Sequence, residues 1–172
     1  MTTIILERVM KFCDSVSEWT GQTVSWLIWI VMALCVFEVF TRRVLNSPHL
    51  WSYDVIDSFY SLHFMLLGGY TLLKGGHVSI DIFSIRCSKK TQSLLQIITY
   101  LIFFFPFFIV FFYTGCKSAF SSWSYFEKTA VGLPFVMPVM KTTIPLASLL
   151  ILIQGIPELA RHITTFRKGR PV

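Results

Sequence analysis

Four apolar stretches, each long enough to cross a bilayer, occupy most of this 172-residue chain. The clearest runs from Thr91 to Cys116 and contains no acidic or basic side chain. About 20 helical residues, at roughly 1.5 Å rise each, already match the ~30 Å hydrocarbon core of a membrane. A chain this short cannot wrap four such helices in its own protein, so lipid must cover them. The sequence therefore predicts one all-α integral membrane domain over residues 1–172.

We place the four predicted transmembrane helices at about residues 21–40, 55–73, 94–116 and 139–159. Only 14% of the residues are charged, against about 25% in an ordinary soluble domain. The polar segments between the predicted helices are too short to build a soluble domain.

Two further segments, one at the N-terminus and one in a loop, have the pattern of amphipathic surface segments. In Met1–Thr20 the apolar residues follow alternating spacings of four and three, which predicts a helix with an apolar stripe lying on the membrane or on a partner; the stripe consists of Ile5, Val9, Phe12, Val16 and Trp19. Charged residues interrupt this segment, so we do not expect a signal peptide. The loop segment His77–Phe83 alternates apolar and polar residues, as a surface-lying segment does.

The basic residues indicate the orientation. With an even number of spans both termini lie on one side, and ten of the 15 basic residues fall there: Arg8, Lys11, Lys74, Arg86, Lys89, Lys90, Arg161, Arg167, Lys168 and Arg170. The opposite side keeps Arg42, Arg43, Lys117, Lys128 and Lys141. The positive-inside rule then predicts that both termini are cytoplasmic. The net charge of +6 indicates contact with anionic lipid rather than with nucleic acid.

Residue patterns of catalysis or cofactor binding are missing from the sequence. The four cysteines share no close spacing, which argues against a disulfide framework or a zinc site. His49, His63 and His77 are spaced by fourteen, but only His63 lies well inside a predicted span, whereas paired haem ligands need matching depth on facing helices. We find no nucleophile elbow, phosphate loop or zinc-protease motif. We therefore expect no enzyme activity, no metal and no cofactor in this chain.

The predicted spans also contain few charges that could form a transport path. Glu38, Asp57 and Glu158 lie near the ends of their helices, where local pairing and the helix dipole explain them. Glu38 precedes Arg42 by one helical turn on the same face. A four-span protein without a polar centre is better suited to be an accessory or scaffold subunit than a carrier.

The segment from Glu38 to Phe83 carries the most specific pattern. Ser47 followed by Pro48 predicts a helix N-cap with proline at the first helical position. Arg42 and Arg43 close the preceding helix, and we expect them to reach Asp54 and Asp57 across the short connection. A small-residue face, where another helix can approach closely, is formed by Ser61, Gly68 and Gly69.

At these residues the chain resembles the small membrane subunit of tripartite ATP-independent periplasmic (TRAP) transporters, the DctQ-like family. The matching positions are Phe40, Arg42, Asn46-Ser47-Pro48, Trp51-Ser52 and the run from Gly75 to Asp81. Tyr53-Asp54 departs from the pattern, since paired acids are common there. The resemblance implies a structural role for the motif residues Arg42, Arg43, Asn46, Ser47, Pro48, Trp51, Asp54, Gly75, Gly76, His77 and Asp81.

The resemblance also implies a function and partners. Such a subunit lies in the bacterial inner membrane as a scaffold beside a large subunit, which carries an organic acid and sodium ions, while a periplasmic binding protein delivers the substrate. Residues Trp123, Glu127 and Lys128 are candidates for docking that binding protein, and we expect the side chains of Glu127 and Lys128 to point to water. The substrate is not encoded in this chain, because the other two components select it. Two alternatives stay open: the membrane anchor of a haem or quinone oxidoreductase, and an autonomous small homo-oligomeric transporter.

Overall fold

The computed structural model describes residues 2–75 and 89–168, which form helices and short connections with no strand among them. In chain order the elements are α1 (Thr2–Ser25), α2 (Leu27–Val44), α3 (Leu50–Leu73), α4 (Lys89–Thr99), the π-helical turn η1 (Tyr100–Phe104), α5 (Phe105–Ser124) and α6 (Val136–Lys168). The predicted all-α fold is confirmed. The surface-lying segment that we predicted at His77–Phe83 falls outside the described residues.

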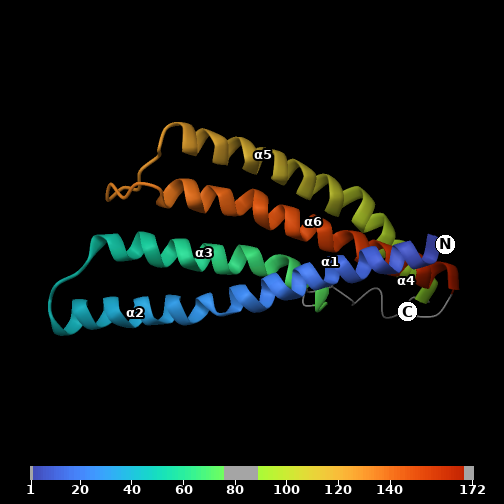
Figure 1. Cartoon of the computed structure of the whole chain (residues 1–172), viewed down its shortest axis with the longest axis horizontal. Helices are drawn as coiled ribbons and strands as arrows, with labels where there is room; N and C mark the ends of the chain where they lie inside the picture. Colours follow the sequence, from blue (N-terminus) through green and yellow to red (C-terminus); the bar gives the residue numbers. More distant parts are fainter. Residues whose placement is uncertain (1, 76–88, 169–172) are drawn as a thin grey trace.

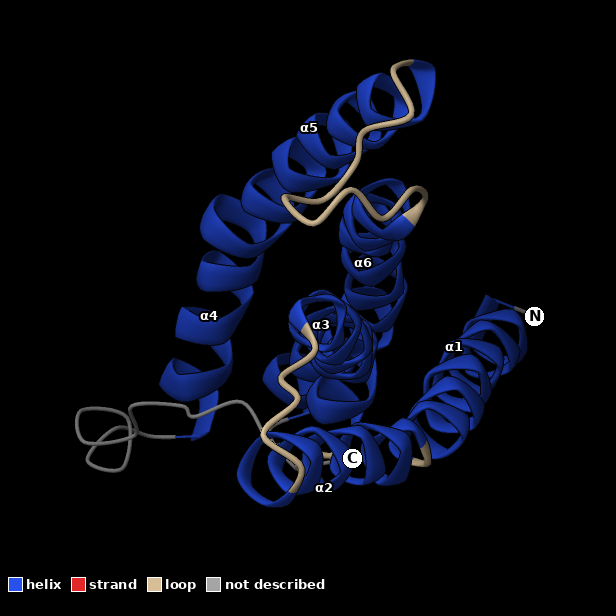
Figure 2. Ribbon diagram, turned by 90° about the vertical axis from the view of Figure 1, so that its left-hand side faces the viewer, coloured by secondary structure: helices blue, strands red, loops and turns tan. Residues whose placement is uncertain are grey.

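The helices form four long paths that run side by side. One path is α1 followed by α2, and another is α4, η1 and α5, so that the turns α2–α3 and α5–α6 lie together at one end of the molecule and α1 begins at the other (Figure 1). Viewed along the bundle, α3 and α6 lie between the α1–α2 path and the α4–α5 path (Figure 2). Helix α6 packs against α1, α3, α4 and α5 and is the centre of the fold.

Three helical paths among the described residues are long and apolar enough to cross a membrane: Met10–Val44, Lys90–Ser124 and Val136–Phe166. They contain three of the four predicted spans. The remaining one, α3, has 24 residues, which is about 36 Å at the helical rise and therefore also long enough. It is not among these three paths, and it carries the polar side chains Asp54, Asp57 and His63. Its central position in the bundle shields part of that polar surface from lipid.

The distribution of side chains is the reverse of that in a soluble protein. Most fully buried side chains are polar or small, among them Ser17, Ser52, Ser148 and Gln154, while large aromatic and aliphatic side chains cover the outside. In lipid the hydrophobic effect does not favour apolar contacts between helices, so close packing of small residues and interhelical hydrogen bonds take its place. This distribution is what a lipid-surrounded bundle requires.

The predicted apolar stripe of the N-terminal helix faces outward. Phe12 and Trp19 each expose 69% of their surface, whereas Cys13 and Ser17 on the opposite face of α1 are buried. The side chains of Ile5 and Val9 fall outside the described part of the chain. Helix α1 thus turns the small residues Cys13, Ser17 and Gly21 to the bundle and its apolar stripe to lipid or a partner, and both interpretations of the stripe stay open.

His63 makes a structural contact at the break between α1 and α2. Its Nδ1 lies 2.9 Å from the carbonyl oxygen of Val24, two residues before Trp26, which separates the two helices. Because a carbonyl oxygen only accepts, Nδ1 carries the proton in this contact. The histidine therefore joins α3 to the bend of the α1–α2 path.

Small residues bring α3 and α5 close to α6. A side chain added at Gly68 would lie 2.8 Å from Ile151, and one at Gly69 would lie 3.3 Å from the Leu150 backbone. The helix that approaches Gly68 and Gly69 is thus α6 of this same chain, so these glycines are not available to a partner subunit. On α5, Gly115 makes the corresponding close approach to α6 beside Pro145.

The π-helical turn η1 has a local cause. Pro106 lacks a backbone N–H and its ring clashes with the carbonyl four residues earlier, which disturbs the regular helix at this point. The widened turn carries Phe104, whose ring lies against Gly155 of α6: an added side chain there would lie 2.4 Å from it. The turn thereby fits the α4–α5 path onto α6.

Candidate functional site

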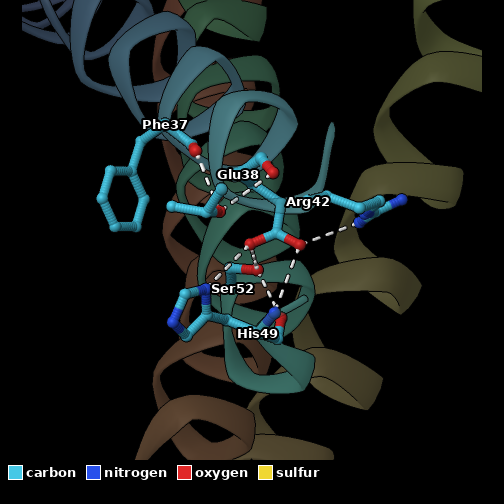
Figure 3. Close-up of polar contacts among 6 residues, drawn as sticks. Phe37, Glu38, Arg42, His49 and Ser52 are labelled. Atoms are coloured by element: carbon cyan, nitrogen blue, oxygen red, sulfur yellow. Dashed lines mark hydrogen bonds and ion pairs between the residues drawn. The ribbon is translucent and has the colours of Figure 1, made fainter. Parts of the chain in front are cut away.

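The most completely built polar site joins the end of α2 to the start of α3. The Glu38 side chain is buried, with 3% of the residue exposed. Its Oε1 accepts a hydrogen bond from Arg42 Nη2 at 2.9 Å, and its Oε2 accepts one from Ser52 Oγ at 2.6 Å. Figure 3 shows the carboxylate between the arginine of its own helix and the first residues of α3. One carboxylate thus holds two helices together.

Glu38 also caps the N-terminus of α3. The backbone N–H of His49, the N-cap residue, donates to Glu38 Oε1 at 3.4 Å, and the helix dipole favours a negative charge at this position. Our prediction that Ser47 is the N-cap was wrong by two residues, because α3 begins at Leu50 and His49 caps it without a side-chain hydrogen bond. An acidic residue from the neighbouring helix supplies the charge that a capping side chain would have given.

Arg42 does not reach across to the acids of α3 as we expected. It pairs with Glu38, one turn earlier on its own helix, and its guanidinium lies 4.8 Å from the centre of the Tyr53 ring. Neither Arg42 nor Arg43 forms an ion pair with Asp54 or Asp57 in the described part of the chain. The nearer carboxylate wins because the i,i+4 spacing already places it beside Arg42. Asp57 is exposed, and the buried Oδ2 of Asp54 has no hydrogen-bond partner.

The Asn46-Ser47-Pro48 turn ends α2 by a helix C-cap. Asn46 has a positive φ of 50°, a left-handed conformation that asparagine tolerates better than most residues. The next N–H, that of Ser47, then donates back to the carbonyl of Thr41 at 3.1 Å. Pro48 cannot continue a helix in this position. These three residues set the direction in which the chain enters α3 and so bring Ser52 to Glu38.

The remaining motif residues divide into two groups. Trp51 lies beside His49 with ring centres 5.7 Å apart, and Gly75 follows α3 in a left-handed conformation with φ 65°, as a helix-terminating glycine does. Gly76, His77 and Asp81 fall outside the described residues.

A second polar site closes the α5–α6 turn at the same end of the bundle. Ser122 Oγ donates to Glu127 Oε2 at 2.7 Å, and Lys141 of α6 forms an ion pair with the same oxygen. Trp123 donates from Nε1 to Thr142 Oγ1 at 2.9 Å. We expected Glu127 to point to water, and this was wrong: Glu127 and Trp123 both bind α6. Of the three candidate docking residues, Trp123 and Lys128 are exposed, and the Lys128 charge has no described ion pair.

The pairing of Glu127 predicts a pH-dependent contribution to stability. The hydrogen bond from Lys141, followed by that from Ser122, lowers the pKa of Glu127 below the usual 4.5. A carboxyl with a lowered folded-state pKa stabilises the protein above its unfolded pKa and stops doing so as the pH falls through the folded value. We therefore expect Glu127→Gln to lower the thermal unfolding midpoint at pH 7 but not near pH 3. Equal differences at both pH values would contradict this role.

A third polar site lies toward the opposite end and was missed from the sequence. Ser17 Oγ of α1 donates to Gln154 Oε1 of α6 at 2.7 Å, and Gln154 Nε2 donates to Asp14 Oδ1 at 2.9 Å. Arg161 Nη2 donates to Asp14 Oδ2 at 2.6 Å and pairs with Glu158. Gln154 is fully buried. The signal in the sequence was Gln154, whose amide lies within an apolar run. Such a polar group needs hydrogen-bond partners inside a membrane, so it indicates a contact with another helix.

The three sites share one chemistry. Each binds a charged or amide side chain to a neighbouring helix, and no group of three or more histidine, cysteine or acidic side chains in the described ranges is arranged to hold a metal ion. The geometry supports helix assembly.

Comparison with known proteins identifies the family of this chain. Residues 30–165 match the family of tripartite ATP-independent periplasmic transporters, DctQ component. No curated protein matches the chain in the corresponding sequence search. Members of this family are components of a transporter and not enzymes, as we expected. Because the match covers most of the chain and includes both hairpin turns, this chain belongs to the DctQ family of TRAP transporter membrane components.

Proposed function

We propose that this chain is the scaffold-type small membrane subunit of a sodium-coupled TRAP transporter. In this role it forms a stable heterodimer with the large membrane component, which binds sodium and carries an organic acid. A periplasmic binding protein delivers that acid. This chain itself holds no cofactor, lies in the bacterial inner membrane, and has both termini in the cytoplasm.

The observation that carries this proposal is the use of polar groups inside the bundle. Glu38, Gln154 and Glu127 are each bound by donors from a neighbouring helix. Groups that bind and release a substrate or an ion must exchange partners, whereas these groups are held in fixed contacts between helices. The outer surface is apolar and aromatic, which suits lipid and a larger membrane partner.

Co-purification tests the partnership. The chain, tagged and expressed with the large TRAP membrane component of the same organism, should carry that component through purification in mild detergent. Native mass spectrometry should then show the two at equal stoichiometry. Recovery of this chain alone or as a homo-oligomer, with the large component folded and present in the same membranes, would contradict the proposal.

The binding protein is proposed to touch the α5–α6 turn, where Lys128 is the exposed charge. We expect Lys128→Glu to weaken uptake when the binding protein is scarce and to have little effect when it is abundant, because reversal of a rim charge mainly slows association. The measurement is uptake across a range of binding-protein concentrations. Lys117→Glu, a reversal of an exposed charge on α5, is the matched control. Identical curves for Lys128→Glu and the unaltered protein would leave this turn without a docking role.

A further inference from the structure

The outer face of α2 is a regular apolar surface without a partner in the described chain. Trp29, Ala33, Val36, Phe40 and Arg43 follow one another at spacings of four, three, four and three residues. This is the repeat that places side chains in one straight seam along a helix. All five residues are exposed. At 100° per residue the seam lies opposite the buried stripe of α2, which contains Val31, Glu38 and Thr41 and packs on α3.

We call this row of five residues the α2 seam. Two adjoining hollows lie along it. Both are shallow and open, and both lie between side chains of α2 itself. One extends from Trp29 to Phe40 around the small Ala33. The other extends from Cys35 to Val44 past Arg43. Large side chains flanking a small one provide the holes into which the side chains of a second helix fit.

The end of the seam carries a charge that the described part of the chain leaves unpaired. Arg42 is paired with Glu38, but no described acidic side chain forms an ion pair with Arg43. Arg43 lines the second hollow. A guanidinium at the end of an apolar transmembrane face is stabilised by an anionic group on whatever covers that face.

We propose that the α2 seam docks a transmembrane helix of the large component, one that carries an acidic side chain at the level of Arg43. This inference rests on the proposed function and adds the face of contact and its charge. The seam lies within the apolar path Met10–Val44, so the periplasmic binding protein cannot reach most of it. Lipid tails can cover an apolar face, but they require neither the alternating spacing nor the small residue between large ones. A partner helix can fill the space beside Ala33 and also supply an acidic side chain for Arg43, which lipid tails cannot do.

Site-specific photo-crosslinking in native membranes tests the seam directly. A photoreactive amino acid replaces Val36 in the seam or, as the matched control, Ile30, which is also exposed on α2 but lies about 120° away from Val36 around the helix. We expect adducts of the Val36 position with the large component, identified by mass spectrometry, and few or none from the Ile30 position. Adducts only with lipid, or only with a second copy of this chain, would overturn the proposal.

Substitutions in the seam add a quantitative measurement. Ala33→Trp fills the first hollow and should reduce co-purified large component roughly tenfold, since overpacking an interface costs that order of affinity. Ile30→Trp should not. Arg43→Glu should also reduce the amount of co-purified large component roughly tenfold. Arg43→Lys should retain most of the complex because it keeps the positive charge. Unfolding midpoints of the purified chains show whether each variant is folded.

The outcomes separate this inference from the function on which it rests. If the unaltered chain recovers the large component but the crosslinks come from Ile30 rather than Val36, the α2 seam is wrong and the scaffold function stands. If the unaltered chain never recovers the large component, the scaffold function itself is wrong.

Discussion

Replacing Glu38 by leucine should destabilise the chain more than any other single substitution at the α2–α3 end. The change leaves the His49 N–H without its acceptor and Arg42 without its ion pair, and Ser52 Oγ keeps only the carbonyl oxygen of His49 as an acceptor. It also removes the charge at the start of α3. Loss of one member of a buried, hydrogen-bonded pair is among the most damaging single changes. We expect the thermal unfolding midpoint in detergent to fall by roughly 10 °C.

Three variants show whether the carboxylate itself is responsible. Asp57→Leu removes an exposed acid from the same hairpin and should change the midpoint little. Arg42→Ala and Ser52→Ala each remove one donor and should have smaller effects than Glu38→Leu, and Arg42→Ala should also reduce the assembled complex in membranes. If Glu38→Leu and Asp57→Leu behaved alike, the proposed clamp between α2 and α3 would be wrong.

The second large effect is expected at Gln154. Gln154→Leu keeps the volume of the side chain but leaves the Ser17 hydroxyl without its acceptor and Asp14 without one donor. Unpaired polar groups of this kind cost about 1 to 3 kcal/mol, and the lower half of that range is typical inside membranes. Unfolding in mixed detergent micelles measures this loss, and α1 should detach from α6 first.

A double-mutant cycle isolates the contact. If Ser17 and Gln154 act through their hydrogen bond, adding Ser17→Ala to Gln154→Leu should cost less than it does in the unaltered chain, because the stranded hydroxyl is removed. Gln96→Leu, at an exposed position of α4, is the control. Strict additivity of the two substitutions would contradict a direct contact.

The fold class was predictable because it depends on the lengths of apolar runs, and any chain with four such runs must satisfy its backbone within helices. The bend at Trp26 was not predictable, since no proline or glycine marks it. The predicted first span, residues 21–40, is instead part of a longer path that begins in α1. Sequence spacing alone does not show that α1 packs on α3 and α6, because this depends on the contact between Gly21 and Tyr70 and on the buried Gln154.

Only part of the candidate site was predicted, because only some of its contacts follow from the spacing of residues in the sequence. Contacts within one helix follow from spacing, and so the pairing of Glu38 with Arg42 was found. Contacts between helices depend on the turn geometry, and so the link from Glu38 to Ser52 was missed. The left-handed Asn46 places α3 such that Ser52 meets the Glu38 carboxylate. The same reasoning explains why Glu127 was expected in water although it binds Lys141.

Reconstituted uptake most directly tests the central claim that this chain serves the large component as a fixed partner. Proteoliposomes containing the large component alone, this chain alone, or both are supplied with the loaded binding protein and a sodium gradient. We expect uptake only when both membrane components are present. Sodium-driven uptake by this chain alone, or full uptake by the large component alone, would contradict the claim.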